Sequence, residues 1–280
     1  MIVPSPNPPL QPPAVFRAHV GRALASADVL EAVRDVDLAD PKGLSVVLLL
    51  IGADPHFSTE TPEPCLILNK RSQRVRQPGD ICCPGGGVEP RIDAFMAHLL
   101  RLPGSPLKNW AHYTRWRHAH PRELRRLNLL LATALREGLE EMRLNPLTVG
   151  FLGSLPSEHL VMFRRIIHPL VVWVNRQRQF YPNWEVERVI RIPLRRLLNP
   201  AHYICYRLSM PWRHAPAAEG GRLDFPAFRF PTAQGTEILW GATYRIVMGF
   251  LKKVMGFRAP DLETLDVVER ELPRQYLTGG

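Results

Sequence analysis

The sequence lacks the features of several protein classes. None of its apolar runs approaches the roughly 20 residues that a membrane-spanning helix needs, and the longest, LSVVLLLI at 44–51, has the length of a buried strand. Its 4 cysteines form no CxxC pair and no zinc-binding spacing. The proline-rich segment 1–13 has no apolar core of the kind that secretory signals contain. We therefore expect a cytoplasmic protein with reduced thiols and no membrane association.

Acidic residues are also scarce. The chain has 26 Asp and Glu against 36 Lys and Arg, which gives a formal net charge of +10. Such a balance favours an anionic partner, which is a nucleic acid, a membrane surface or a phosphorylated small molecule. With 45% hydrophobic residues, the 280-residue chain is expected to fold around a sizeable core.

Against this shortage, three of the acids occur together in LREGLEEMRL at 135–144. Glu137, Glu140 and Glu141 have the spacing i, i+3, i+4, so we expect them on one face of a helix. The apolar residues of the same helix are expected on the opposite face: Leu131, Leu135, Leu139 and Met142. The acidic face is either solvated or a site for a divalent cation, because hard cations prefer carboxylate oxygens.

A glycine-rich segment, CCPGGGVEP, precedes this helix. Three successive glycines allow a backbone to approach a ligand closely, although an ordinary tight turn has the same composition.

Together, PGGGVEPRID and LREGLEEMRL resemble the Nudix box, the glycine loop and REUxEE helix of Nudix hydrolases. In this chain 42 residues lie between Asp93 and Arg136, where the family has about seven, so the basic segment at about 94–126 is interpreted as an insertion. A closed loop of this length is tolerable because closure entropy grows only slowly with length.

Flanking segments resemble the coenzyme A diphosphatase-type proteins of that family. LILNKRSQRVRQPGDICCPGG is similar to the signature that precedes their box, with Asn69 in place of a Thr and Cys83 in place of an aromatic residue. WEVERVIRIPLRRLL and ILWGATYRIV are similar to two later segments of the subfamily.

The resemblance implies roles for particular residues. Mg²⁺ or Mn²⁺ would be the cofactor, with Glu137, Glu140 and Glu141 as its ligands. Catalysis would involve Glu137, Glu140 and Arg136, the last orienting a carboxylate. Either Glu137, Glu158 or Glu185 would be the general base. The substrate-binding residues implied are Arg71, Arg76, Gly85, Gly86 and Gly87.

We expect an α/β fold, implied by the resemblance to be a Nudix-like α/β/α sandwich with a mixed sheet. After a tail at 1–13, residues 14–280 are expected to form one domain. Predicted helices cover 14–36, 127 to about 143 and 235–254, with Asn145 and Pro146 as an alternative end for the second. Predicted strands cover 43–52, 63–70, 80–83, 148–155, 166–174, 187–194 and 202–208.

Three functions remain open. The first is hydrolysis of a diphosphate linkage in coenzyme A or a related nucleoside diphosphate derivative. The second is a Nudix hydrolase of another substrate, such as a dinucleotide, nucleotide sugar or RNA cap. The third is a non-catalytic ligand- or nucleic-acid-binding protein, suggested by Trp110, Tyr113 and Trp116 among the cations of the insertion. A small nucleoside diphosphate derivative is the favoured partner and nucleic acid the less favoured one.

Overall fold

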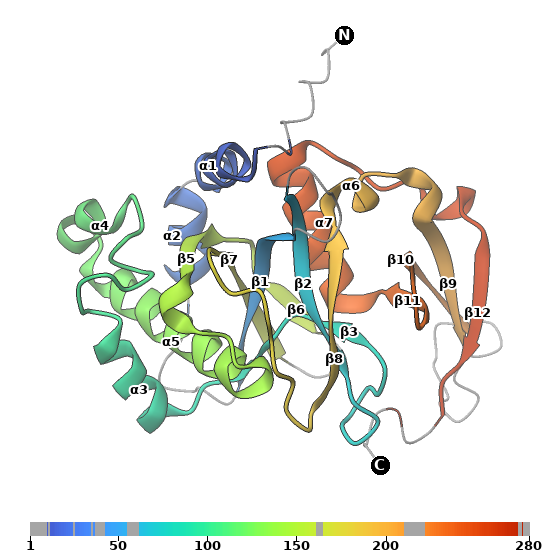
Figure 1. The fold of residues 1–280 in the computed structure, drawn as a ribbon, viewed down its shortest axis with the longest axis horizontal. Helices are drawn as coiled ribbons and strands as arrows, with labels where there is room; N and C mark the ends of the chain where they lie inside the picture. The colour runs from blue at the N-terminus through green and yellow to red at the C-terminus, as the bar shows by residue number, and fades with distance from the viewer. Residues whose placement is uncertain are drawn as a thin grey trace, which may run out of the picture.

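The computed structural model describes residues 10–273 except positions 11, 25, 35, 37–42, 55–61, 161–164 and 210–221, and it also describes Tyr276. Figure 1 shows one sheet with helices on both of its faces and a second sheet beyond α7. The mixed α/β architecture predicted from the sequence is confirmed. The proline-rich tail lies outside the described residues apart from Leu10, Pro12 and Pro13, and the assignment of 14–280 to one domain stays a prediction.

The larger sheet has eight strands, of which five form a continuous path in the order β3-β2-β1-β7-β5. Strands β1 and β7 are parallel, and the other pairs in this sheet are antiparallel, so the sheet is mixed. Its members are β1 (Leu44–Asp54), β2 (Glu63–Arg71), β3 (Ile81–Cys82), β4 (Gly85–Gly87), β5 (Val149–Ser154), β6 (Glu158–Leu160), β7 (Arg165–Val174) and β8 (Val186–Pro193).

Alternate residues of β1 enter different cores, as the two-residue period of a strand requires. Val46, Leu48 and Leu50 pack with α2 (Ser26–Arg34) and α5 (Pro121–Met142). Leu49 and Ile51 pack with α1 (Pro13–Ala23) and α7 (Gly241–Met255) on the other face. The larger sheet is therefore covered by helices on both sides (Figure 1).

A second sheet of four strands, in the order β11-β10-β9-β12, lies on the far side of α7 (Figure 1). It comprises β9 (Tyr203–Ser209), β10 (Arg222–Thr232), β11 (Gly235–Leu239) and β12 (Val267–Glu271). The short helix α6 (Leu194–Leu197) leads from β8 toward β9. Because Phe228 and Phe230 of β10 share a core with Phe250 of α7, this sheet is joined to the helix by apolar packing.

The predicted insertion is a packed helical segment and not a solvated loop. It contains most of α3 (Pro90–Leu99), all of α4 (Tyr113–Ala119) and the start of α5. Trp110 and Trp116 are only 5% and 2% exposed, and their rings meet edge to face with centroids 5.1 Å apart. Buried rings are not accessible for base stacking, which removes the main sequence argument for a single-stranded nucleic acid partner.

Three predicted helix boundaries were wrong. The expected helix at 14–36 is two helices, α1 and α2, which end and begin on either side of Leu24. The helix that carries the three glutamates begins at Pro121, before the predicted Leu127, because proline is well suited to the first turn. The expected helix at 235–254 begins with a strand, β11, and becomes helical only at Gly241. Strands β10 and β12 were not predicted.

Helix α5 ends at Met142, and Arg143 follows with a left-handed backbone (φ 55°, ψ 37°). The alternative end near Asn145 is therefore wrong. Asn145 instead begins a short turn, where its side chain accepts a hydrogen bond from the Leu147 amide. In the described residues, no helix is long and apolar enough to cross a bilayer.

Candidate functional site

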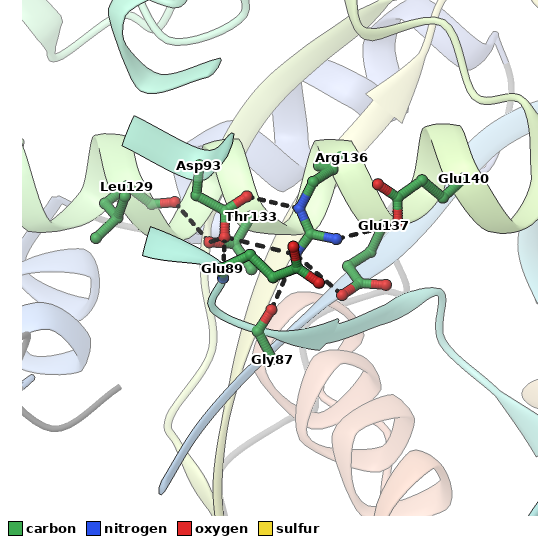
Figure 2. A network of polar contacts seen from close by, with 8 residues as sticks. All are labelled: Gly87, Glu89, Asp93, Leu129, Thr133, Arg136, Glu137 and Glu140. Atoms are coloured by element: carbon green, nitrogen blue, oxygen red, sulfur yellow. Dashed lines mark hydrogen bonds and ion pairs between the residues drawn. The ribbon is translucent and has the colours of Figure 1, made fainter. Parts of the chain in front are cut away.

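Arg136 is the centre of a polar network between α5 and the glycine segment (Figure 2). The residue is only 4% exposed. Its Nη2 donates to the Gly87 carbonyl at 2.9 Å and to Glu137 Oε1 at 3.1 Å, and its Nη1 donates to Glu140 Oε2 at 3.0 Å. Two glutamates predicted as metal ligands are thus held by the arginine predicted to orient them, and the same side chain binds the glycine backbone.

Asp93 holds Arg136 from the other side. Its side chain is fully buried and accepts a 2.7 Å hydrogen bond from Arg136 Nε. Asp93 Oδ2 also accepts from the Glu89 amide at 2.7 Å and from Thr133 Oγ1 at 2.8 Å. No role was predicted for Asp93 from the sequence. Its position was the available signal: Asp93 closes the glycine half of the interrupted motif, and Arg136 belongs to the other half.

The three glutamates, which were expected on one helix face, have different environments. The Glu140 side chain is 51% exposed and the Glu137 side chain 16% exposed. Glu141 is buried and accepts a 2.8 Å hydrogen bond from Asn69 Nδ2 on β2. The signature that this segment resembles has a Thr at the position of Asn69. The site therefore receives this hydrogen-bond donor from a position at which the sequence departs from the family pattern.

Burial raises the pKa of two of these acids. It raises the pKa of Glu141 to about 8, an effect that the charge of Glu137 increases and the hydrogen bonds from Asn69 and the Gly85 backbone oppose. Burial also raises the pKa of Glu137, although the neighbouring charge of Arg136 lowers it. A buried carboxyl with a raised pKa is typical of functional sites.

The glycines fit the site because two of them have no room for a side chain. Strand β4 pairs with β1, opposite Val46 and Val47. A Cβ at Gly85 (φ 151°) would lie 2.2 Å from the Val46 carbonyl oxygen, and a Cβ at Gly86 would lie 2.3 Å from Glu137 Oε1. At Gly87 the nearest atom would be 4.0 Å away. Gly86 therefore leaves open the space that the Glu137 carboxylate uses.

A cavity of about 710 Å³ adjoins Gly85 and Gly86 between the larger sheet, the second sheet and the start of α7. Arg71 and Arg245 line it, as does Glu158, which binds Arg245 Nε at 2.8 Å. Arg76, predicted to bind substrate, is not among the lining residues. Its carbonyl instead accepts from Arg71 Nε at 2.7 Å, so its backbone positions the arginine that lines the cavity.

The other two candidate bases have different neighbours. Glu185 is close enough to Glu137 and Glu141 for its charge to raise the pKa of both. Its carbonyl accepts a hydrogen bond from the Ser72 amide, next to Arg71. Glu158 faces the cavity. Proximity therefore associates Glu185 with the buried glutamates and Glu158 with the cavity, and the choice of base among the three acids remains open.

The donor types suit a hard divalent cation, because the site offers carboxylate oxygens beside a glycine backbone. In the described part of the chain, no three His, Cys, Asp or Glu side chains already converge as a metal-binding cluster. Glu137 and Glu140 are paired with Arg136, whereas Glu141 is held apart by Asn69. The mutual repulsion of Glu137 and Glu141 is a feature that a bound cation would relieve.

No protein-family model and no curated protein matches the chain. Among solved structures, a NUDIX hydrolase from Alicyclobacillus acidocaldarius is 18% identical, with 55% of this chain and 80% of that chain covered and a TM-score of 0.36. An Ap4A hydrolase from C. elegans, in a binary complex, is 10% identical, with 54% and 80% covered and a TM-score of 0.33.

The NUDIX domain of Shewanella oneidensis NrtR, complexed with ADP ribose, is 14% identical, with 60% of this chain and 84% of that chain covered and a TM-score of 0.32. At these low identities and TM-scores, the likenesses carry no argument about activity or substrate.

Proposed function

We propose that this chain is a Nudix-type hydrolase that cleaves a diphosphate linkage in a nucleoside diphosphate derivative. One observation carries the proposal: Arg136 joins the two separated halves of the motif, binding Gly87 in the glycine segment and Glu137 and Glu140 on the acidic helix. The interrupted motif is thereby reassembled in space.

In this proposal Glu137, Glu140 and Glu141 hold Mg²⁺ or Mn²⁺. When bound, such a cation neutralises diphosphate charge and lowers the pKa of an attacking water. The chain's own groups supply the rest of the site. Arg136 orients Glu137 and Glu140, while Asn69 and the Gly85 amide orient Glu141. A proton from water passes to one of the three candidate bases, Glu137, Glu158 or Glu185.

Substrate binding is assigned to the 710 Å³ cavity, whose volume lies within the range of nucleotide-sized pockets. Arg71 and Arg245 place two guanidinium groups on its wall, and guanidinium pairs well with phosphate oxygens. The aromatic residues Trp240 and Phe225 also line it and offer surfaces for a base. These features support an anionic, partly aromatic small molecule.

Within this class we propose coenzyme A or a close relative as the substrate, on the strength of the sequence signature around Arg71. Coenzyme A carries a 3′-phosphate in addition to its diphosphate, so its hydrolysis should yield 3′,5′-ADP and a phosphopantetheine product. The test is incubation of the purified protein with Mg²⁺ or Mn²⁺ and coenzyme A, 3′-dephospho-coenzyme A, a dinucleotide, a nucleotide sugar or capped RNA, with products identified by mass spectrometry.

A preference for coenzyme A over its 3′-dephospho form supports the full proposal. Equal rates on these two, or turnover of another member of the panel alone, would remove the coenzyme A assignment and keep the hydrolase. No turnover of any diphosphate substrate would contradict hydrolase function and favour a ligand-binding protein.

The metal-binding role is tested with Glu140→Gln and Glu141→Gln. Both variants should lose most turnover at saturating Mg²⁺ while remaining folded. Glu123→Gln is the matched control, since Glu123 lies in the first turn of the same helix and outside the site. Normal turnover in the two site variants would exclude these carboxylates from the mechanism.

A further inference from the structure

A second hollow, of about 310 Å³, lies inside the helical insertion and away from the glutamates. Its walls come from the end of α3, the following turns, α4 and the first two turns of α5. We call it the insertion pocket. Because it shares no lining residue with the 710 Å³ cavity, it is a separate site.

The charged residues that line the insertion pocket are all basic. Four of its lining residues are cations, and none is an acid: Arg101, Lys108, Arg117 and Arg125. In the described residues, none of the four forms an ion pair within the chain. Four cations that surround one hollow repel one another, and this repulsion is relieved when an anion binds between them.

The inner wall of the insertion pocket is apolar. Leu100, Leu107 and Leu124 line it and are each less than 10% exposed, and the Tyr113 ring lies beside them. An inorganic anion would not use this surface, whereas an organic anion with an aromatic or apolar body would cover it.

Asn128 adds a polar feature to the same wall. It is 5% exposed, and its Nδ2 donates to the Ala97 carbonyl at 2.7 Å. Its Oδ1 is buried and has no hydrogen-bond partner. A buried acceptor without a donor is unfavourable, so a ligand N–H or O–H group that reaches Asn128 Oδ1 would restore a hydrogen bond.

We propose that the insertion pocket binds a small phosphomonoester of nucleotide size. The four cations receive the phosphate, the leucine wall and Tyr113 receive the ring system, and Asn128 Oδ1 accepts from a ring or sugar donor. The volume is at the lower end of ligand pockets, which suits a mononucleotide better than a dinucleotide. This proposal does not depend on the hydrolase activity.

The probe is AMP, titrated calorimetrically into the full-length protein in the presence of EDTA, with adenosine and inorganic phosphate in parallel. AMP should bind, and adenosine and phosphate should each bind at least tenfold more weakly. The double variant Arg101→Ser, Arg117→Ser should weaken AMP binding at least tenfold with an unchanged melting temperature.

The double variant Arg115→Ser, Arg122→Ser is the matched control, because it removes the same charge from the same insertion at positions outside the pocket lining. It should bind AMP normally. Arg71→Ser removes a cation from the wall of the larger cavity, so AMP bound there is weakened in Arg71→Ser and retained in Arg101→Ser, Arg117→Ser. Three results would overturn the proposal. They are an equal loss of AMP affinity in both double variants, a loss of AMP affinity in Arg71→Ser alone, and no binding of AMP to the unmodified chain. Tighter binding of a single-stranded RNA, lost equally in both double variants, would replace it with a general nucleic-acid surface.

Discussion

The Glu137 carboxylate occupies the space where the side chain of any other residue at position 86 would begin, since a Cβ on Gly86 would lie 2.3 Å from its Oε1. The Gly86→Ala variant should therefore displace Glu137 and reduce turnover about 100-fold, the scale expected for a small misplacement in an active site. The fold should survive, because the clashing atoms are the far end of a flexible side chain. Steady-state kinetics and a melting curve measure both effects.

Gly87→Ala is the control for this prediction, since its nearest neighbour would be 4.0 Å away. It should keep near-normal turnover. If Gly86→Ala is as active as Gly87→Ala, the contact between Gly86 and Glu137 has no role in catalysis.

Asp93→Asn should destabilise the protein by about 3 kcal/mol, because it leaves the buried Arg136 without its closest anionic partner. Urea unfolding monitored by tryptophan fluorescence gives the change in free energy of unfolding. Asp224→Asn removes an acid from the exposed pair with Arg207 and should leave unfolding unchanged. Similar unfolding curves for Asp93→Asn and the unmodified protein would contradict the role of Asp93 as the buried counter-ion.

The raised pKa of Glu141 predicts a pH dependence of stability. Its pKa is 4.5 in the unfolded chain and about 8 in the fold, so the folded state holds the proton more tightly. The resulting stability is fully present below pH 4.5 and is lost as the pH rises through about 8. In EDTA, the melting temperature should fall across this window, and Glu141→Gln should remove that part of the fall. An identical pH profile for the variant would show that Glu141 titrates normally.

Arg143 predicts a stabilising change. A left-handed backbone costs a non-glycine residue about 1–2 kcal/mol, and Arg143 adopts it to end α5. Arg143→Gly should raise the free energy of unfolding by about 1 kcal/mol. Arg143→Ala removes the same side chain without relieving the backbone and should give no gain. If both variants change the free energy of unfolding equally, the effect comes from the loss of the Arg143 side chain and not from its backbone conformation.

The sequence predicted the parts of the fold that have strong local signals. The strand β1 was visible because its uninterrupted apolar run has the length of a buried strand, and the leucine stripe of α5 because its apolar residues follow the helical period. The split between α1 and α2 was missed because the apolar spacing continues across it. The strand β11 was missed because GTEILWGATYRIV joins two apolar segments without a clear break, and its pairing with β10 is a tertiary contact.

The sequence predicted which glutamates belong to the candidate site, but not how buried each one is or which residues it contacts. Spacing on the helix placed Glu137, Glu140 and Glu141 together, and this part of the prediction needs only local geometry. The burial of Glu141 depends on Asn69, which is 72 positions away. The role of Asp93 depends on a contact across 43 positions. Helical spacing carries no information about either partner, so both had to come from the tertiary structure.

The contact between Asp93 and Arg136 has a consequence for how such a chain can diversify. The segment through α3, α4 and the start of α5 begins and ends beside two side chains that are in contact. The glycine segment and the acidic helix therefore keep their spacing whatever the length of the segment between them. Doubling the length of such a connection costs only about 0.6 kcal/mol. The segment can therefore change in length or composition in the course of evolution while this contact keeps the two halves of the candidate site together.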